Sequence, residues 1–177
     1  MSVRSAVLEA ERIIDQLGYT RSDLPINVET IAKDLDLCVV KTELDDDVSG
    51  LLVAKKSADD QVHIFVNIQD SPVRRRFTIS HEIGHHVLGH KFDSSGVHID
   101  RGNYVIPRKT KNAKYEPREV EANEFAACLL MPARLVFETV GELSQPLFDQ
   151  HVTQLSRIFH VSEQAMTIRL TRLGILS

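Results

Sequence analysis

Two histidines and a glutamate with the spacing of a metal site occur in His81-Glu82-Ile83-Gly84-His85. On a helix, residues four apart project from the same face, so both imidazoles can bind one ion at ~2.0–2.1 Å. Glu82 lies about 100° further around the helix, where its carboxylate can take a proton from a metal-bound water. This H-E-x-x-H spacing is typical of zinc hydrolases. It predicts zinc ligands at His81 and His85 and a general base at Glu82.

The flanking sequence predicts that this motif lies on a buried helix. Ser71 and Pro72 are typical of a helix N-cap and first turn, and apolar residues follow on two sides of the helix. Two imidazoles and a carboxylate are costly to bury unless something pairs them, and a divalent cation would do so. The apolar flanks therefore favour a metal site over a surface helix that holds histidines by chance.

A catalytic zinc normally has three protein ligands and one open position. A third histidine in the metzincin register is excluded, because Leu88 and Lys91 stand where that pattern requires glycine and histidine. We therefore expect His86 and His90 to be peripheral to the site.

The remaining candidates for the third ligand are acidic residues on a second helix, predicted over residues 118–131. At about 100° per residue, Glu119 falls on the side of this helix that carries small apolar residues, whereas Glu121 and Glu124 fall outside it. Glu119 is therefore the predicted ligand, and Glu121 is the alternative. We otherwise expect Glu121 and Glu124 to be solvated charges. Asn123, one turn after Glu119, is expected to hydrogen-bond a neighbouring ligand.

Together, the segments 76–85 and 119–132 resemble the ImmA/IrrE family of zinc metallopeptidases, and residues 24–32 and 49–51 match further phrases of that family. The resemblance implies a gluzincin-like peptidase with a zincin-like core, in which His81, His85 and Glu119 hold one Zn²⁺ per chain. It also implies an intracellular protease that cleaves a helix-turn-helix transcriptional repressor and so derepresses mobile-element, stress or phage-defence genes.

The pattern of apolar residues predicts an α+β fold in a single metallopeptidase domain, residues 1–177. Its parts are an N-terminal helical segment (1–37), a catalytic core (38–140) and a C-terminal helical segment (141–177). Helices are expected at 3–17 and 28–37, and three strands at 38–44, 49–55 and 61–67 form a small antiparallel sheet whose last two strands make a hairpin. We expect strand 61–67 at a sheet edge, where it could hold an extended peptide substrate.

The composition is that of an ordinary globular domain, with 177 residues, 42% hydrophobic residues and a formal net charge of −4. The sequence has no signal-peptide pattern and no apolar run approaching ~18 residues. We therefore expect a cytoplasmic protein with no membrane partner. Cys38 and Cys128 form no C-x-x-C pair and are expected to be reduced core residues.

A long polar stretch, residues 90–117, follows the motif helix and is either a lid or binding loop or a solvated loop. Peptide hydrolysis needs a donor that stabilises the developing oxyanion. The candidates in or beside this stretch are His98, Tyr104, Tyr115 and Arg118.

Two alternatives to the peptidase remain. Residues 155–170 resemble a helix-turn-helix, which would suit a DNA-binding transcriptional regulator. This segment has few cations, however, and the chain is acidic overall. We therefore favour a helical hairpin that packs on the catalytic core. A metal-bound, non-catalytic binding protein is the other alternative, and the presence of Glu82 argues against it. A cluster at Arg74, Arg75 and Arg76, with a basic run at 108–114, suggests single-stranded DNA as an activating signal.

Overall fold

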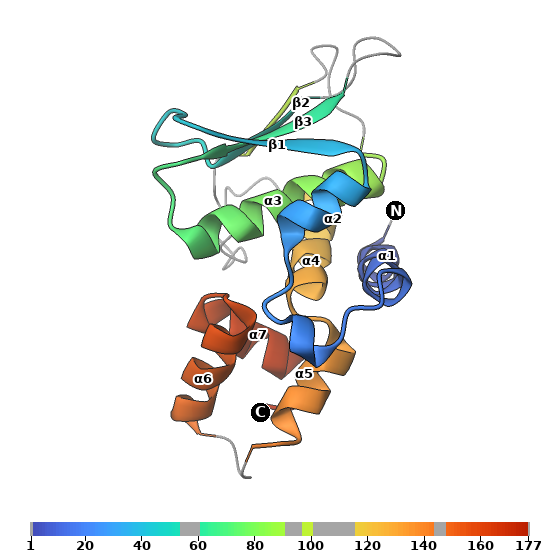
Figure 1. Cartoon of the computed structure of the whole chain (residues 1–177), viewed down its shortest axis with the longest axis vertical. Coiled ribbons are helices and arrows are strands. Elements are labelled where there is room, and N and C mark those ends of the chain that lie inside the picture. Colours follow the sequence, from blue (N-terminus) through green and yellow to red (C-terminus); the bar gives the residue numbers. More distant parts are fainter. Residues whose placement is uncertain (1, 54–60, 91–96, 101–115, 144–147, 177) are drawn as a thin grey trace.

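The computed structural model describes residues 2–53, 61–90, 97–100, 116–143 and 148–176 (Figure 1). The predicted α+β class is confirmed. In chain order the elements are α1 (Val3–Gln16), the short 3₁₀ helix η1 (Arg21–Asp23), α2 (Val28–Asp34), β1 (Leu37–Thr42), β2 (Gly50–Val53), β3 (Val62–Asn67), α3 (Pro72–Val87), β4 (Val97–Asp100), α4 (Pro117–Leu130), α5 (Ala133–Val140), α6 (Asp149–Phe159) and α7 (Glu163–Arg172).

The sheet differs from the predicted one in strand number and direction. It has four described strands in the order β1-β3-β2-β4. β2 pairs antiparallel with β3, as the predicted hairpin requires, but β1 runs parallel to β3, so the sheet is mixed. β4 pairs antiparallel with β2 and was not predicted. It has four residues, only two of them apolar, within a polar stretch, so its alternation is too short to stand out.

The expectation that residues 61–67 form an edge strand is wrong. β3 is an inner strand between β1 and β2, and Val62, Ile64 and Val66 are buried. Among the described strands, β1 and β4 lie at the edges. The strand next to the motif helix in sequence is therefore enclosed, and β4 is the edge strand that carries His98.

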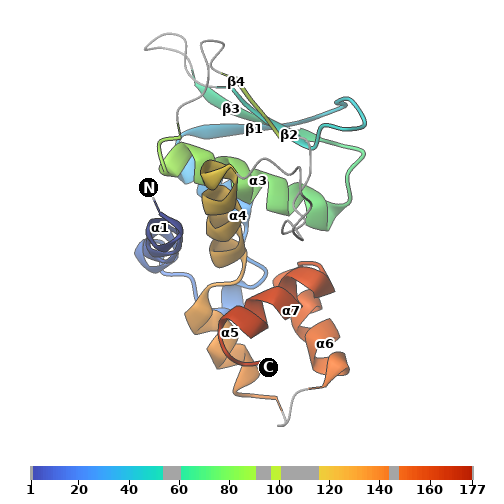
Figure 2. The same cartoon turned by 180° about the vertical axis from the view of Figure 1, so that it is seen from behind.

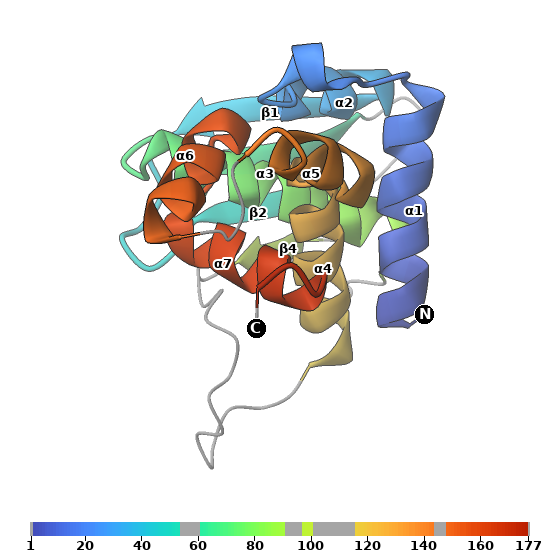
Figure 3. The same ribbon diagram turned by 90° about the horizontal axis from the view of Figure 1, so that it is seen from below.

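The helices pack on one face of the sheet (Figure 1). α3 lies directly against this face, and α4 crosses α3 on the side away from the strands (Figure 2). α1 runs beside α4, as the view from below shows (Figure 3). Helix α3 is therefore covered by the sheet on one side and by α4 on the other, which explains why residues 78–85 are all buried.

The C-terminal segment forms a helical hairpin, α6–α7, below α4 and beside α5 (Figure 1). His160 ends α6 in the left-handed conformation with φ 52°, and the Ser162 side chain caps α7 by accepting from the amide of Ala165. This turn lies where the sequence predicts it. Across the part of the chain that the structure describes, no helix combines the length and the apolar character needed to cross a bilayer.

Candidate metal centre

Local sequence signals determine where α3 starts and how it is buried. The Ser71 side chain accepts a hydrogen bond from the amide of Arg74, and Pro72 occupies the first turn, as predicted. The three motif side chains, His81, Glu82 and His85, are at most 1% exposed. Because solvent cannot stabilise them, their hydrogen-bond partners determine what they can bind.

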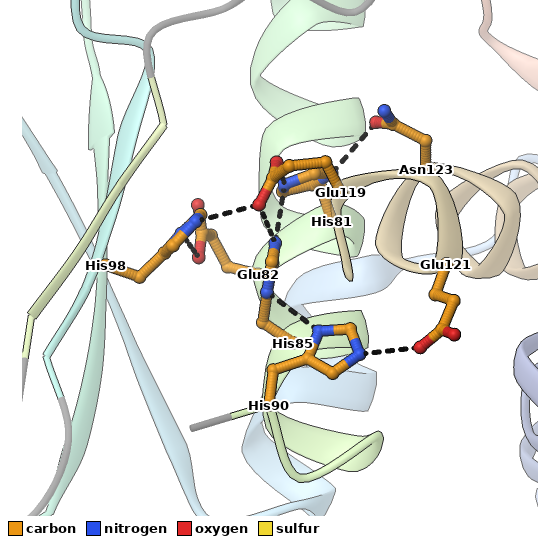
Figure 4. A network of polar contacts seen from close by, with 8 residues as sticks. All are labelled: His81, Glu82, His85, His90, His98, Glu119, Glu121 and Asn123. Carbon is orange, nitrogen blue, oxygen red and sulfur yellow. Dashed lines mark hydrogen bonds and ion pairs between the residues drawn. The ribbon is translucent and has the colours of Figure 1, made fainter. Parts of the chain in front are cut away.

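Three potential ligand atoms converge between α3 and α4 (Figure 4). The Nε2 atoms of His81 and His85 are 2.9 Å apart. Each lies 3.3 Å from a different oxygen of the Glu119 carboxylate. These three residues offer ligand atoms that all lie within 4.8 Å of one another. The structure thus brings together the three residues that the sequence nominates as zinc ligands.

Hydrogen bonds on the far sides of the imidazoles direct their lone pairs toward Glu119. Nδ1 of His81 is 3.0 Å from Oδ1 of Asn123, and because an amide oxygen only accepts, the Nδ1–H donates. Nε2 of a neutral His81 then carries a lone pair. This is the contact predicted for Asn123. Nδ1 of His85 similarly contacts Nδ1 of His90 at 2.9 Å.

Three acceptor atoms that face one another repel unless a cation joins them. A nitrogen, nitrogen and carboxylate set is the donor chemistry that Zn²⁺ accepts, with one position left for water or substrate. The donor set of His81, His85 and Glu119 therefore fits a zinc ion.

The ionisation of the cluster follows from burial and from these contacts. Burial lowers the pKa of His85 to about 3, so this imidazole is neutral and able to act as a ligand. Burial raises the pKa of Glu119, but its contacts with the imidazoles of His81, His85 and His98 outweigh it and hold that pKa below its ordinary value. Glu119 is consequently a carboxylate at neutral pH.

Glu82 lies beside the three potential ligands, on the side of the sheet. Its Oε2 is 3.3 Å from Nδ1 of His98, and its Oε1 has no hydrogen-bond partner among the described residues. Burial raises the pKa of Glu82, although His98 and His81 counteract this, and the charge of buried Asp100 raises it further. A buried carboxylate with a raised pKa and a free oxygen is suited to take up and release a proton.

His98 is the candidate oxyanion donor that the structure places at the site. From β4, its Nε2 lies 3.1 Å from Oε1 of Glu119 and its Nδ1 faces Glu82. Burial lowers the pKa of His98, but hydrogen bonds with Glu119 and Glu82 raise it to about 10. Arg118 is exposed in the first turn of α4, whereas Tyr104 and Tyr115 lie outside the described residues.

Two predictions about side chains around the site are wrong. His90, expected to be peripheral, is buried and contacts both His85 and Glu121. Glu121 and Glu124, expected to be solvated, are also buried: Glu121 contacts His90, and Glu124 contacts Arg169 and Arg172. Helical periodicity identified the side of α4 on which each residue lies, but not the partners that permit acids to be buried there.

The cations that suggested nucleic-acid binding contact acceptors within the protein. Arg74 donates to the hydroxyl of Ser49. Arg75 donates to the backbone carbonyls of Ile68 and Asp70. Arg76 donates to the backbone carbonyls of Ile26, Phe159 and His160. Arg169 in the helical hairpin is buried and donates to the carbonyl of Met131. The basic run 108–114 lies outside the described residues.

Comparisons with known proteins place this geometry in a family. Among curated proteins none matches the chain. A solved structure described as a Mycobacterium tuberculosis transcriptional regulator is similar to it, with a TM-score of 0.59 and 19% sequence identity, which supports the fold alone. The match covers 96% of this chain and 48% of that one, so the chain spans about half the length of this relative. A family model described as the IrrE N-terminal-like domain matches residues 32–171, most of the chain, and the chain therefore belongs to this metallopeptidase family, Peptidase_M78.

Proposed function

We propose that this chain is a zinc-dependent endopeptidase that binds one Zn²⁺ through His81, His85 and Glu119. The observation that carries the proposal is the convergence of two imidazole nitrogens and a carboxylate, with Glu82 beside them. When bound, zinc would act as a Lewis acid that lowers the pKa of a water molecule toward ~7 and polarises the substrate carbonyl.

The chain's own residues would move the proton and stabilise the developing charge. Glu82 would accept the proton of the attacking water, because its Oε1 has no hydrogen-bond partner in the part of the chain that the structure describes, and would pass it to the departing amine. His98 would donate to the substrate oxygen as negative charge develops there, because it reaches the site from the edge strand. Asn123 would orient His81 by keeping the proton on Nδ1.

The position of β4 supports a polypeptide as the substrate. Among the described strands β4 pairs only with β2, so its other edge can accept an extended peptide by strand addition. A peptide held there would lie beside His98. This replaces the expectation that residues 61–67 bind the substrate.

We propose a helix-turn-helix transcriptional repressor as the protein substrate, cleaved to derepress mobile-element, stress or phage-defence genes. The family membership and the resemblance of segments 76–85 and 119–132 support this substrate class. The cytoplasmic location expected from the sequence stays a prediction. Binding of single-stranded DNA as an activator would mainly use the basic run 108–114, because the arginines of α3 already contact acceptors within the protein.

The test measures zinc content and the cleavage of purified helix-turn-helix repressors from the same genome. Glu82→Gln should retain zinc and lower the cleavage rate by ~10²–10⁴-fold, because it removes only the base. Glu119→Gln should lose both zinc and cleavage. Fragments are identified by mass spectrometry.

Three outcomes would overturn parts of the proposal. Zinc loss in Glu121→Gln but not in Glu119→Gln would show that the third ligand is misassigned. Zinc binding without cleavage of any tested repressor, in wild type and Glu82→Gln alike, would identify a metal-bound binding protein. Cleavage by Glu82→Gln at the wild-type rate would exclude the assigned base.

A further inference from the structure

His90 lies five residues beyond His85, yet the end of α3 brings its ring back to the motif. Leu88 is the C-cap, and Gly89 follows with φ 63°, a conformation that glycine adopts without strain. The amide of Gly89 donates to the carbonyl of His86 at 3.1 Å, and the amide of His90 donates to that of His85 at 3.0 Å. This pair of bonds is a Schellman turn. It places the rings of His85 and His90 with their centroids 4.9 Å apart.

The other side of the His90 ring meets a buried acid from α4. Nε2 of His90 is 3.0 Å from Oε2 of Glu121 (Figure 4). Glu121 is only 5% exposed. A carboxylate only accepts hydrogen bonds, so Nε2 of His90 carries the hydrogen. In a neutral ring Nδ1 is then the acceptor, and it lies 2.9 Å from Nδ1 of His85. His85 therefore donates its Nδ1–H to His90.

This direction of the hydrogen bonds determines which nitrogen of His85 carries the lone pair. With the proton on Nδ1, the lone pair of Nε2 faces His81 and Glu119. The opposite tautomer would place a hydrogen atom between the ligand atoms, where a metal ion has to bind. His81 reaches the same tautomer through its contact with Asn123. Helix α4 thus supplies a ligand at Glu119 and the residues that orient both histidines.

We propose that His90 and Glu121 form a positioning pair that holds His85 in the Nδ1–H tautomer and thereby increases its affinity for zinc. The inference rests on the zinc site of the proposed function. Partners of this kind contribute ~10–100-fold to metal affinity. Neither residue belongs to the H-E-x-x-H motif.

The tautomer can be measured directly on the metal-free wild-type chain. Long-range ¹H–¹⁵N correlation spectra of histidine-labelled protein distinguish a protonated Nδ1 from a protonated Nε2 on each ring. His85 should show a protonated Nδ1 and a bare Nε2, and His90 the reverse. A bare Nδ1 on His85 in the wild type would overturn the proposal without any mutation.

Zinc affinity, measured by competition with a chromophoric chelator, tests the consequence. His90→Phe leaves the buried Nδ1–H of His85 without an acceptor and should weaken zinc binding by ~10–100-fold. His90→Asn restores an amide oxygen that can accept this hydrogen, so it should recover much of the affinity. Glu121→Leu should weaken binding, and Glu121→Gln should do so less because its carbonyl still accepts from His90.

Glu124→Gln is the matched control, because Glu124 is also a buried acid of α4 but contacts Arg169 and Arg172 instead. It should bind zinc like the wild type. Wild-type affinity in folded His90→Phe, or an equal loss in His90→Asn and His90→Phe, would overturn the positioning role. Failure of the proposed function is distinguishable, because it would appear as absent cleavage in a chain whose zinc affinity and tautomers still depend on His90 and Glu121.

Discussion

At the scale of single residues, Glu82 is stabilised less well than a buried carboxylate usually is. One oxygen has no hydrogen-bond partner among the described residues, and the side chain is 0% exposed. An unsatisfied buried polar atom costs about 1–3 kcal/mol. The backbone of β2 lies close by: a Cβ added to Gly50 would come within 2.4 Å of Thr78 Cγ2 and 3.7 Å of this Glu82 oxygen. A buried carboxylate with one unsatisfied oxygen is typical of a functional site.

Zinc binding should tighten as the pH rises. In the metal-free chain, burial lowers the pKa of His81, but its hydrogen bond with Glu119 and the charges of Glu82 and Asp100 outweigh this and raise it above its ordinary value. The raised pKa keeps a proton on His81 at mildly acidic pH, and zinc must displace it. Chelator competition between about pH 6 and 8, corrected for protonation of the chelator, measures this. An affinity that does not change across this range would contradict the prediction.

Residue-level predictions from the sequence succeeded where a helix alone sets the geometry. Glu119 lies near both motif histidines, and Asn123 hydrogen-bonds His81. Both positions could be predicted because they follow from the periodicity of the helix. The contacts of His90 could not be predicted in the same way. They depend on a left-handed turn at Gly89 and on an acid 31 residues further along the chain. Gly89-His90 directly after a helix was the local signal for this turn.

At the scale of elements, the site depends on close packing between α3 and α4. Gly84 of α3 faces the ring of Phe125 of α4, and an added Cβ would lie 3.0–3.2 Å from three of its atoms. Glu119 and Asn123 are on α4, whereas His81 and His85 are on α3. The separation of the two helices therefore sets the distances within the candidate metal site.

Gly84→Ala should weaken zinc binding and destabilise the fold together. The new methyl group pushes against Phe125, and overpacking of this kind costs about 1–3 kcal/mol. Chelator competition and urea unfolding measure the two effects. Gly141→Ala is the matched control, because its Cβ would meet no atom of the described residues closer than 3.4 Å. The control should keep wild-type zinc affinity and gain up to about 1 kcal/mol in stability. Wild-type behaviour of Gly84→Ala in both measurements would show that α4 can shift without consequence.

The elements themselves were predictable only to the extent that their pattern is local. α1 and α4 begin and end within one residue of the predicted limits, and α3 begins at the predicted cap, because capping residues and apolar periodicity mark them. Strand neighbours were not predictable: the parallel pairing of β1 with β3 joins segments separated by β2, and nothing local distinguishes it from an antiparallel meander.

At the scale of the whole molecule, the buried cation Arg169 links the C-terminal hairpin to the other helices. Arg169 of α7 is 5% exposed and donates to the carbonyl of Met131 at 2.9 Å. Its guanidinium also lies 3.6 Å from Glu11 of α1 and 3.9 Å from Glu124 of α4. Glu11 in turn accepts from the amide of Ala133 at 3.0 Å, where α5 begins. Four helices from both ends of the chain therefore meet at this cluster, which supports a packing role for the hairpin over DNA reading.

Replacing this cation separates the two roles that the hairpin could have. Arg169→Met removes the guanidinium that lies beside Glu11 and Glu124, and Glu124 keeps its ion pair with Arg172. The free energy of unfolding in urea should therefore fall by about 3 kcal/mol. Arg157→Met, on the exposed face of α6, is the control and should change it by less than about 0.5 kcal/mol. A buried cation that holds helices together affects stability, whereas one that binds phosphate affects DNA affinity. If Arg169→Met were as stable as wild type but lost a binding to double-stranded DNA that the wild type shows, the hairpin would be a DNA-binding element and the packing role would be wrong.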